Sequence, residues 1–88
     1  MYYVYVLKSR KYKTIKIYIG STSDLVKRIE QHNSSQNVST RYGIPWKLVY
    51  YEAFLNKDDA LKRELRLKSG TSAIGFLKRR IKQSLDTS

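Results

Sequence analysis

Two or three tyrosine hydroxyl groups are expected to gather on one face of a hairpin near the start of the chain. Runs of β-branched and aromatic residues predict two antiparallel strands, at residues 2–7 and 14–20. Because side chains alternate across a strand, packing of the aliphatic faces would leave Tyr3, Tyr5 and Tyr18 together on the opposite face. Gly20 shares that face, and its missing side chain would let another group approach the backbone. Cross-strand aromatic pairing explains the same pattern without any chemistry.

A helix is predicted directly after the second strand, with a cation and an imidazole on one side. Its apolar arc consists of Leu25, Val26 and Ile29. His32 falls at the edge of this arc and Arg28 on its flank. The two are spaced i, i+4, so both can reach one anionic group. The alternative is a surface pair between Asp24 and Arg28, with His32 as an ordinary packed side chain.

A carboxylate interrupts the apolar arc of a later helix. That arc consists of Ala60, Leu61, Leu65 and Leu67. Glu64 projects into its middle, where a carboxylate is costly unless a cation meets it. Two interpretations stay open: an ion pair with Lys68, four residues on, or a divalent metal. No cluster of further carboxylates predicts a two-metal site, and a single histidine argues against zinc.

The other elements follow from caps, turn residues and strand propensity. Thr22 or Ser23 is expected to cap the first helix, Asn56 the second, and Thr71 or Ser72 the third, while Gly70 ends the second. The polar stretch 33–45 predicts a loop, 46–54 a strand, and 57–68 a helix. A third helix is expected to align Ile74, Leu77, Ile81 and Leu85. The order ββαβαα predicts an α+β fold, a small antiparallel sheet covered by helices.

The charge of the chain predicts a polyanionic partner. The 88 residues include 18 Lys and Arg against 7 Asp and Glu, which gives a formal net charge of +11. Nucleic acid is the partner that such an imbalance favours first, and no segment predicts a membrane span or signal peptide. We expect one domain, residues 1–88, in the cytoplasm. Expected contacts to the nucleic-acid backbone are Lys8, Arg10, Lys11, Lys13, Arg41, Arg79, Arg80 and Lys82.

Several of these residues recur in a known order. Tyr3-Val4-Tyr5 and Tyr18-Ile19-Gly20 resemble the paired signature of the GIY-YIG nuclease domain. The order continues with SxxDLxxRxxxH from position 21, PWKLVYYE from 45 and ALKRELRLK from 60. The resemblance extends over residues 1 to about 83. It is greatest to small single-domain members, related to the amino-terminal nuclease domain of the bacterial excision-repair endonuclease. Two departures are Tyr3 in place of the first signature glycine and no asparagine after Lys68.

The resemblance implies a three-stranded antiparallel sheet flanked by helices and a metal-dependent endonuclease that hydrolyses phosphodiester bonds. It implies one Mg²⁺ or Mn²⁺ ion held by Glu64, with Gly20 close to the nucleic acid. The implied catalytic residues are Tyr5, Tyr18, Arg28, His32 and Glu64. DNA of branched, nicked or damaged structure is the expected substrate, favoured over RNA, and a protein partner could supply specificity, as in DNA repair. The alternative is a nucleic-acid-binding module with this fold and weak or no catalysis.

Overall fold

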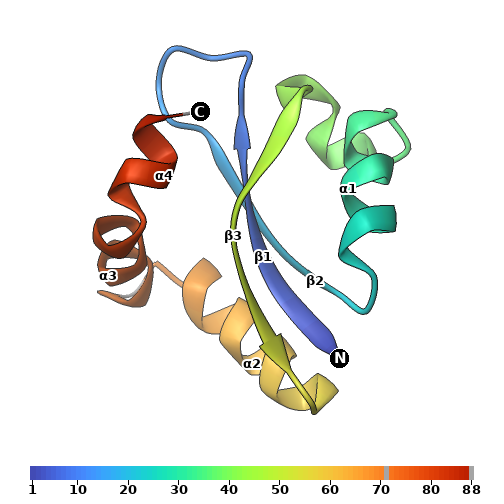
Figure 1. Ribbon diagram of the computed structural model, residues 1–88, viewed down its shortest axis with the longest axis vertical. Coiled ribbons are helices and arrows are strands. Elements are labelled where there is room, and N and C mark those ends of the chain that lie inside the picture. The colour runs from blue at the N-terminus through green and yellow to red at the C-terminus, as the bar shows by residue number, and fades with distance from the viewer. Residues whose placement is uncertain (71, 88) are drawn as a thin grey trace.

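The computed structural model describes residues 1–70 and 72–87 and has the expected α+β architecture (Figure 1). Three antiparallel strands form one sheet in the order β2-β1-β3. The strands are β1 (Tyr2–Ser9), β2 (Ile17–Thr22) and β3 (Trp46–Phe54). Helix α1 lies over one face of the sheet, and α2, α3 and α4 lie over the other (Figure 1). The helices are α1 (Leu25–Asn33), α2 (Lys57–Lys68), α3 (Ser72–Arg80) and α4 (Lys82–Asp86).

The central strand β1 is buried on both faces. Val4 and Val6 pack on one side in a cluster with residues of α2, α3 and α4. Tyr5 and Leu7 pack on the other side with Trp46 and residues of α1. Each of these four β1 side chains is almost fully shielded from solvent, which is worth about 1.5–3 kcal/mol for a large apolar side chain. One strand therefore carries both halves of the core.

The alternation predicted for the hairpin is confirmed by the strand register. Tyr3 pairs with Thr22, Tyr5 with Gly20, and Leu7 with Tyr18. Directly opposed residues share a face of the sheet, so the three tyrosines do lie on one face. That face is covered by α1 and belongs to the protein interior around Tyr5.

The apolar arcs predicted for the first two helices were partly wrong. Val26 is 70% exposed, and Leu61 and Leu65 are 39% and 68% exposed. In α2 the buried residues are Ala60 and Leu67, which are separated by seven residues and so lie on one side of the helix. Leu61 and Leu65 lie about 100–140° round the helix from Ala60, beyond the reach of the sheet.

Helix boundaries differ from expectation at three places. The N-cap of α1 is Asp24, whose carboxylate accepts the Lys27 N–H at 3.1 Å, and not Thr22 or Ser23. The stretch 33–45 contains a short 3₁₀ helix, η1 (Val38–Gly43). The expected third helix is divided into α3 and α4 at Ile81, although its apolar side is buried at Leu77, Ile81 and Leu85.

Two expected caps are confirmed. The side chain of Asn56 accepts the Asp58 N–H at 2.7 Å and begins α2. Gly70, with φ of 74°, follows α2 in the left-handed conformation that favours glycine. The alternative cap of the third helix, Thr71, lies outside the described residues.

Candidate active site

The hydroxyl group of Tyr5 is the point on which two helical side chains converge. Tyr5 comes from the centre of β1, and its ring is fully buried. Its oxygen lies 2.8 Å from Nε2 of His32, and Nε of Arg28 donates to it at 3.4 Å. The two residues spaced i, i+4 on α1 therefore meet at one oxygen atom, and Arg28 is directed to Tyr5 instead of Asp24.

Gly20 makes room for this hydroxyl group. It is the direct cross-strand partner of Tyr5 on β2. A β-carbon at position 20 would stand 2.6 Å from Cζ of Tyr5 and 3.1 Å from Cε2 of Tyr18, closer than side chains pack. The glycine is thus required by the position of the Tyr5 ring.

A chain of hydrogen bonds fixes the protonation of His32. Its Nδ1 atom lies 2.8 Å from Oγ1 of Thr40, and that hydroxyl group donates to the carbonyl of Asn37 at 3.3 Å. Because the Thr40 proton is used there, Nδ1–H donates to Thr40, and Nε2 accepts the proton of Tyr5. This arrangement makes His32 a proton acceptor for the phenol.

The electrostatics agree with that assignment. Burial, with a smaller contribution from the charge of Arg28, lowers the pKa of His32 below its usual 6.5. Burial likewise raises the pKa of Tyr5 above 10, against the opposing hydrogen bond from Arg28. At neutral pH the pair is therefore a neutral imidazole accepting from a protonated phenol.

Tyr18 completes the aromatic group beside Gly20. Its ring centroid lies 4.9 Å from that of His32 and 6.3 Å from that of Tyr5. Nζ of Lys68 lies 5.5 Å from the Tyr18 centroid, within the range of a cation–π contact. Tyr18 thus lies between α1 and the last turn of α2.

Glu64 faces the edge of β2 from α2. Oε1 accepts the hydroxyl of Ser21 at 2.7 Å, and Oε2 accepts Nζ of Lys68 at 2.7 Å. The carboxylate side chain is 17% exposed. The ion pair with Lys68 is thus present, and its existence does not exclude the metal interpretation. Burial and the charge of Tyr18 raise the pKa of Tyr5 more than the charge of Glu64 does.

The donor set around Glu64 suits one hard cation better than a metal cluster. Within residues 1–70 and 72–87 no three His, Asp or Glu side chains are grouped to hold an ion. Mg²⁺ in nucleases and kinases commonly uses one or two carboxylates, with waters and substrate phosphates completing the shell. The Glu64 carboxylate is the kind of oxygen ligand that a single Mg²⁺ or Mn²⁺ takes, and an ion there would have to displace Lys68.

The expected backbone contacts are spread over both sides of the molecule. Arg79 and Arg80 end α3 and Lys82 begins α4, in the layer opposite α1 (Figure 1). Lys8 is only 8% exposed, and its ammonium group donates to the carbonyl of Leu85. Burial therefore removes Lys8 from the surface available to a nucleic acid. Arg10, Lys11 and Lys13 are exposed between β1 and β2, and Nε of Arg41 donates to the Ser35 carbonyl at 2.9 Å.

Thr40 is the part of the site that the sequence did not indicate. It lies in the polar stretch interpreted as a loop, and nothing in its type or spacing links it to His32. Its side chain is fully buried in η1, and the indole of Trp46 donates to its carbonyl at 2.8 Å. Only the folded chain brings Thr40 to the imidazole.

Comparison with known proteins identifies the family to which the chain belongs. A family model described as the GIY-YIG catalytic domain matches residues 1–83, and the chain belongs to this family. GIY-YIG domains are nuclease domains, which act on nucleic acid and generally depend on a divalent metal. No solved structure matches the chain. Within residues 1–70 and 72–87, none of the helices has the length and apolar character that a membrane crossing requires.

Several curated proteins named UPF0213 are similar to the chain. The chain is 44% identical over 72 residues to a UPF0213 protein of Clostridium perfringens, covering 81% of this chain and 74% of that protein. It is 37% identical over 81 residues to a UPF0213 protein of Pediococcus pentosaceus, covering 89% and 82%. It is also 39% identical over 69 residues to one from Staphylococcus saprophyticus, covering 77% and 80%.

Proposed function

We propose that this protein is a divalent-metal-dependent endonuclease that hydrolyses phosphodiester bonds in structured DNA, such as branched, nicked or damaged duplexes, in the cytoplasm. The observation that carries the proposal is the convergence of Arg28 and His32 on the buried hydroxyl of Tyr5. The net charge of +11 supports a polyanionic substrate. The remaining exposed basic residues would contact the backbone without reading sequence.

Proton transfer in this site runs through Tyr5. An attacking water gives its proton to the phenolic oxygen as the phenol gives its own proton to Nε2 of His32. The hydroxide formed attacks phosphorus, and the ester bond to the leaving oxygen breaks, with solvent protonating that oxygen. A relay of this kind avoids a free phenolate, which the raised pKa of Tyr5 makes unfavourable at neutral pH.

Negative charge on the phosphate is met from two sides. Arg28 points at Tyr5 and can donate to a phosphate oxygen placed next to that hydroxyl. Glu64 would hold Mg²⁺ or Mn²⁺, and the bound ion would supply charge neutralisation at the phosphate and the leaving oxygen. Tyr18, whose ring is tilted by 59° against that of His32, would orient the water or the phosphate.

A binding module without strong catalysis is the second candidate. It is favoured by the ion pair of Lys68 with Glu64, which occupies the carboxylate that the metal needs. The absence of an asparagine after Lys68 points the same way.

Cleavage of labelled branched, nicked and linear DNA, and of a matched RNA, separates the two candidates. The reactions contain Mg²⁺, Mn²⁺ or EDTA and compare the wild type with Glu64→Gln. Glu30→Gln, an exposed change on α1, is the matched control for loss of a carboxylate. Metal-dependent cutting of DNA that is lost only in Glu64→Gln, with DNA binding retained, supports the nuclease. Tight, salt-sensitive binding without cutting by any of the three proteins supports the binding module.

A further inference from the structure

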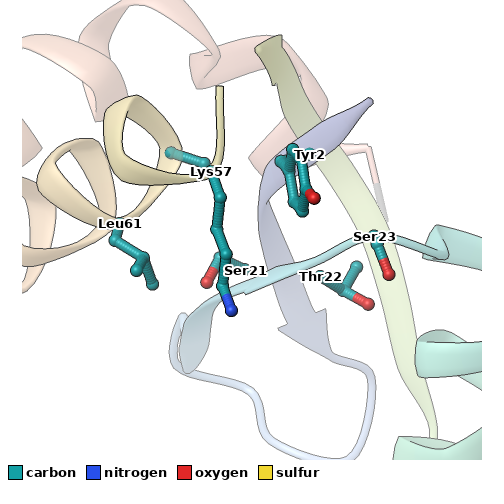
Figure 2. A pocket seen from close by; sticks show the side chains of 7 residues that line it. Tyr2, Ser21, Thr22, Ser23, Lys57 and Leu61 are labelled. Atoms are coloured by element: carbon teal, nitrogen blue, oxygen red, sulfur yellow. The ribbon is translucent and has the colours of Figure 1, made fainter. Parts of the chain in front are cut away.

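A cavity of about 240 Å³ lies between the end of β2 and the first turns of α2 (Figure 2). Its walls carry three consecutive hydroxyl residues and one ammonium group. They consist of Tyr2, Ser21, Thr22, Ser23, Lys57, Ala60 and Leu61. Figure 2 shows the side chain of Lys57 extending from α2 toward Ser21 and Thr22 of β2. Lys57 is the charged residue of this lining, and none of the lining residues is a carboxylate.

The cavity is joined to the candidate active site through Ser21. The hydroxyl group of Ser21 donates to Glu64 at 2.7 Å, so one wall of the cavity contacts the proposed metal ligand. Lys57, Leu61 and Glu64 follow one another at i, i+4 and i+7 and so lie along one side of α2. Glu64 is about 10 Å along the helix axis from Lys57. A strand of nucleic acid that passes Glu64 along this side therefore passes Lys57 as well.

The ammonium group of Lys57 is available to an anion. Among residues 1–70 and 72–87, the ion pairs join Arg63 to Glu52 and Lys68 to Glu64, and Lys57 takes part in neither. The neighbouring acids Asp58 and Asp59 point elsewhere, because each residue turns the helix by about 100°. Ser21 and Thr22 already use their hydroxyl groups on Glu64 and on the backbone of Asp24. Lys57 is thus the main group in this cavity that attracts an anion.

We propose that this cavity binds a backbone phosphate of the DNA strand, next to the phosphate that is cut. Lysine is a compact charge that binds phosphate, and the hydroxyl groups of Tyr2 and Ser23 on the cavity wall can donate to phosphate oxygens. The volume is below the roughly 300–1,000 Å³ of sites that enclose drug-sized ligands, so it accommodates a phosphate better than a whole nucleotide.

This phosphate contact would set where the strand lies over Tyr5 and Glu64. It rests on the proposed nuclease function and adds a requirement to it: the strand must continue past the cut on the Lys57 side. A terminal nucleotide that lacks the neighbouring phosphate would lose this contact. The site thus selects internal phosphodiester bonds.

The test is DNA binding in EDTA, where no cutting interferes, with Lys57→Gln in the full chain. Lys62→Gln is the matched control, an exposed lysine on the same helix about 140° away from Lys57. Fluorescence anisotropy over a range of salt gives the slope of log K against log[salt]. Loss of one phosphate contact reduces this slope by about 0.7–0.9, and we expect that reduction in Lys57→Gln only.

Neutral methylphosphonate linkages, introduced one at a time, then locate the contact. The wild type should lose affinity when the linkage beside the cut is neutral, and Lys57→Gln should be insensitive at that linkage alone. Equal slopes for Lys57→Gln and Lys62→Gln, or unchanged sensitivity of Lys57→Gln at every linkage, would overturn the proposal. So would binding of inorganic phosphate that depends on Lys57 while DNA affinity does not, because the cavity would then serve a free anion.

The phosphate site and the nuclease function can fail independently, and the experiments tell the two failures apart. One outcome is that no DNA is cut with any metal ion, while Lys57→Gln still removes the sensitivity of binding to one neutral linkage. The phosphate site then stands and the nuclease function fails. If cutting occurs and Lys57→Gln matches Lys62→Gln in every measurement, the nuclease stands and the phosphate site fails.

Discussion

The ring of Tyr5 fills the space that a side chain at Gly20 would occupy, since a β-carbon there would stand 2.6 Å from Cζ of Tyr5. The two residues are direct partners across β1 and β2. A glycine at position 20 therefore has a steric reason in this chain. It lets the phenol reach Arg28 and His32 of α1.

Gly20→Ala is expected to displace the Tyr5 ring. Forcing a methyl group into this packed position should lower the free energy of unfolding by about 1–3 kcal/mol and reduce cleavage further than that loss explains. Gly75→Ala is the matched control, because a β-carbon at Gly75 of α3 meets nothing within 4 Å. It should stabilise the protein by about 0.5–1 kcal/mol. Urea unfolding and cleavage of the same DNA measure both effects, and wild-type behaviour of Gly20→Ala would contradict the steric explanation.

Tyr5→Phe is expected to remove the group on which the relay depends. Cleavage should fall by about 10²-fold or more, with DNA affinity retained. Stability should fall by about 1–3 kcal/mol, because Nε2 of His32 is left buried without its 2.8 Å partner. Tyr51→Phe is the matched control, because Tyr51 is 53% exposed. This change should leave both cleavage and stability as in the wild type. Single-turnover cutting that persists in Tyr5→Phe would assign the proton transfer to another residue.

Stability should depend on pH through His32. Burial and the charge of Arg28 hold the pKa of His32 below its usual 6.5 in the folded protein. The unfolded chain therefore binds the proton first as the pH falls. The contribution of His32 is complete above about pH 6.5 and is lost as the pH falls from there toward the lowered folded pKa. Urea unfolding between about pH 7.5 and 5.5 should show this loss in the wild type and not in His32→Gln. If the free energy of unfolding depends on pH equally in the two proteins, His32 is not the source of the loss.

Lys68→Gln should strengthen metal binding. The Lys68 ammonium group lies 2.7 Å from Oε2 of Glu64, so it competes with any ion for that carboxylate. Removing it should tighten Mn²⁺ binding several-fold, measured by electron paramagnetic resonance of free Mn²⁺ without any DNA. Lys62→Gln removes the same charge from an exposed position of α2 and should change the affinity less. Weaker Mn²⁺ binding in Lys68→Gln than in Lys62→Gln would mean that Lys68 supports the ion instead.

The parts of the molecule that could be predicted from sequence are those set by local rules. Strand alternation placed Tyr3, Tyr5 and Tyr18 on one face, and cap chemistry located Asn56 and Gly70. The i, i+4 spacing predicted that Arg28 and His32 can reach one common group. It could not show that this group is the hydroxyl of Tyr5 on β1.

What could not be predicted depends on how the layers meet. Val26 and Leu65 are apolar and face solvent, because the sheet reaches only the side of each helix that lies against it. The role of Thr40 depends on η1 folding back onto His32, a contact between residues that local pattern does not relate. The residue pattern left two interpretations of Glu64 open, an ion pair and a metal site, because both need the same carboxylate.

The strand β1 belongs to both halves of the core, and this ties the chemistry to the global unfolding reaction. Local opening exposes amides only where a segment can detach from its neighbours, and a strand paired on both sides with both faces covered has no such freedom. The amide protons of β1, at Tyr5 above all, should exchange with deuterated solvent only when the whole domain unfolds. The slowest-exchanging amides in this protein would then mark the strand that supplies its proposed general base.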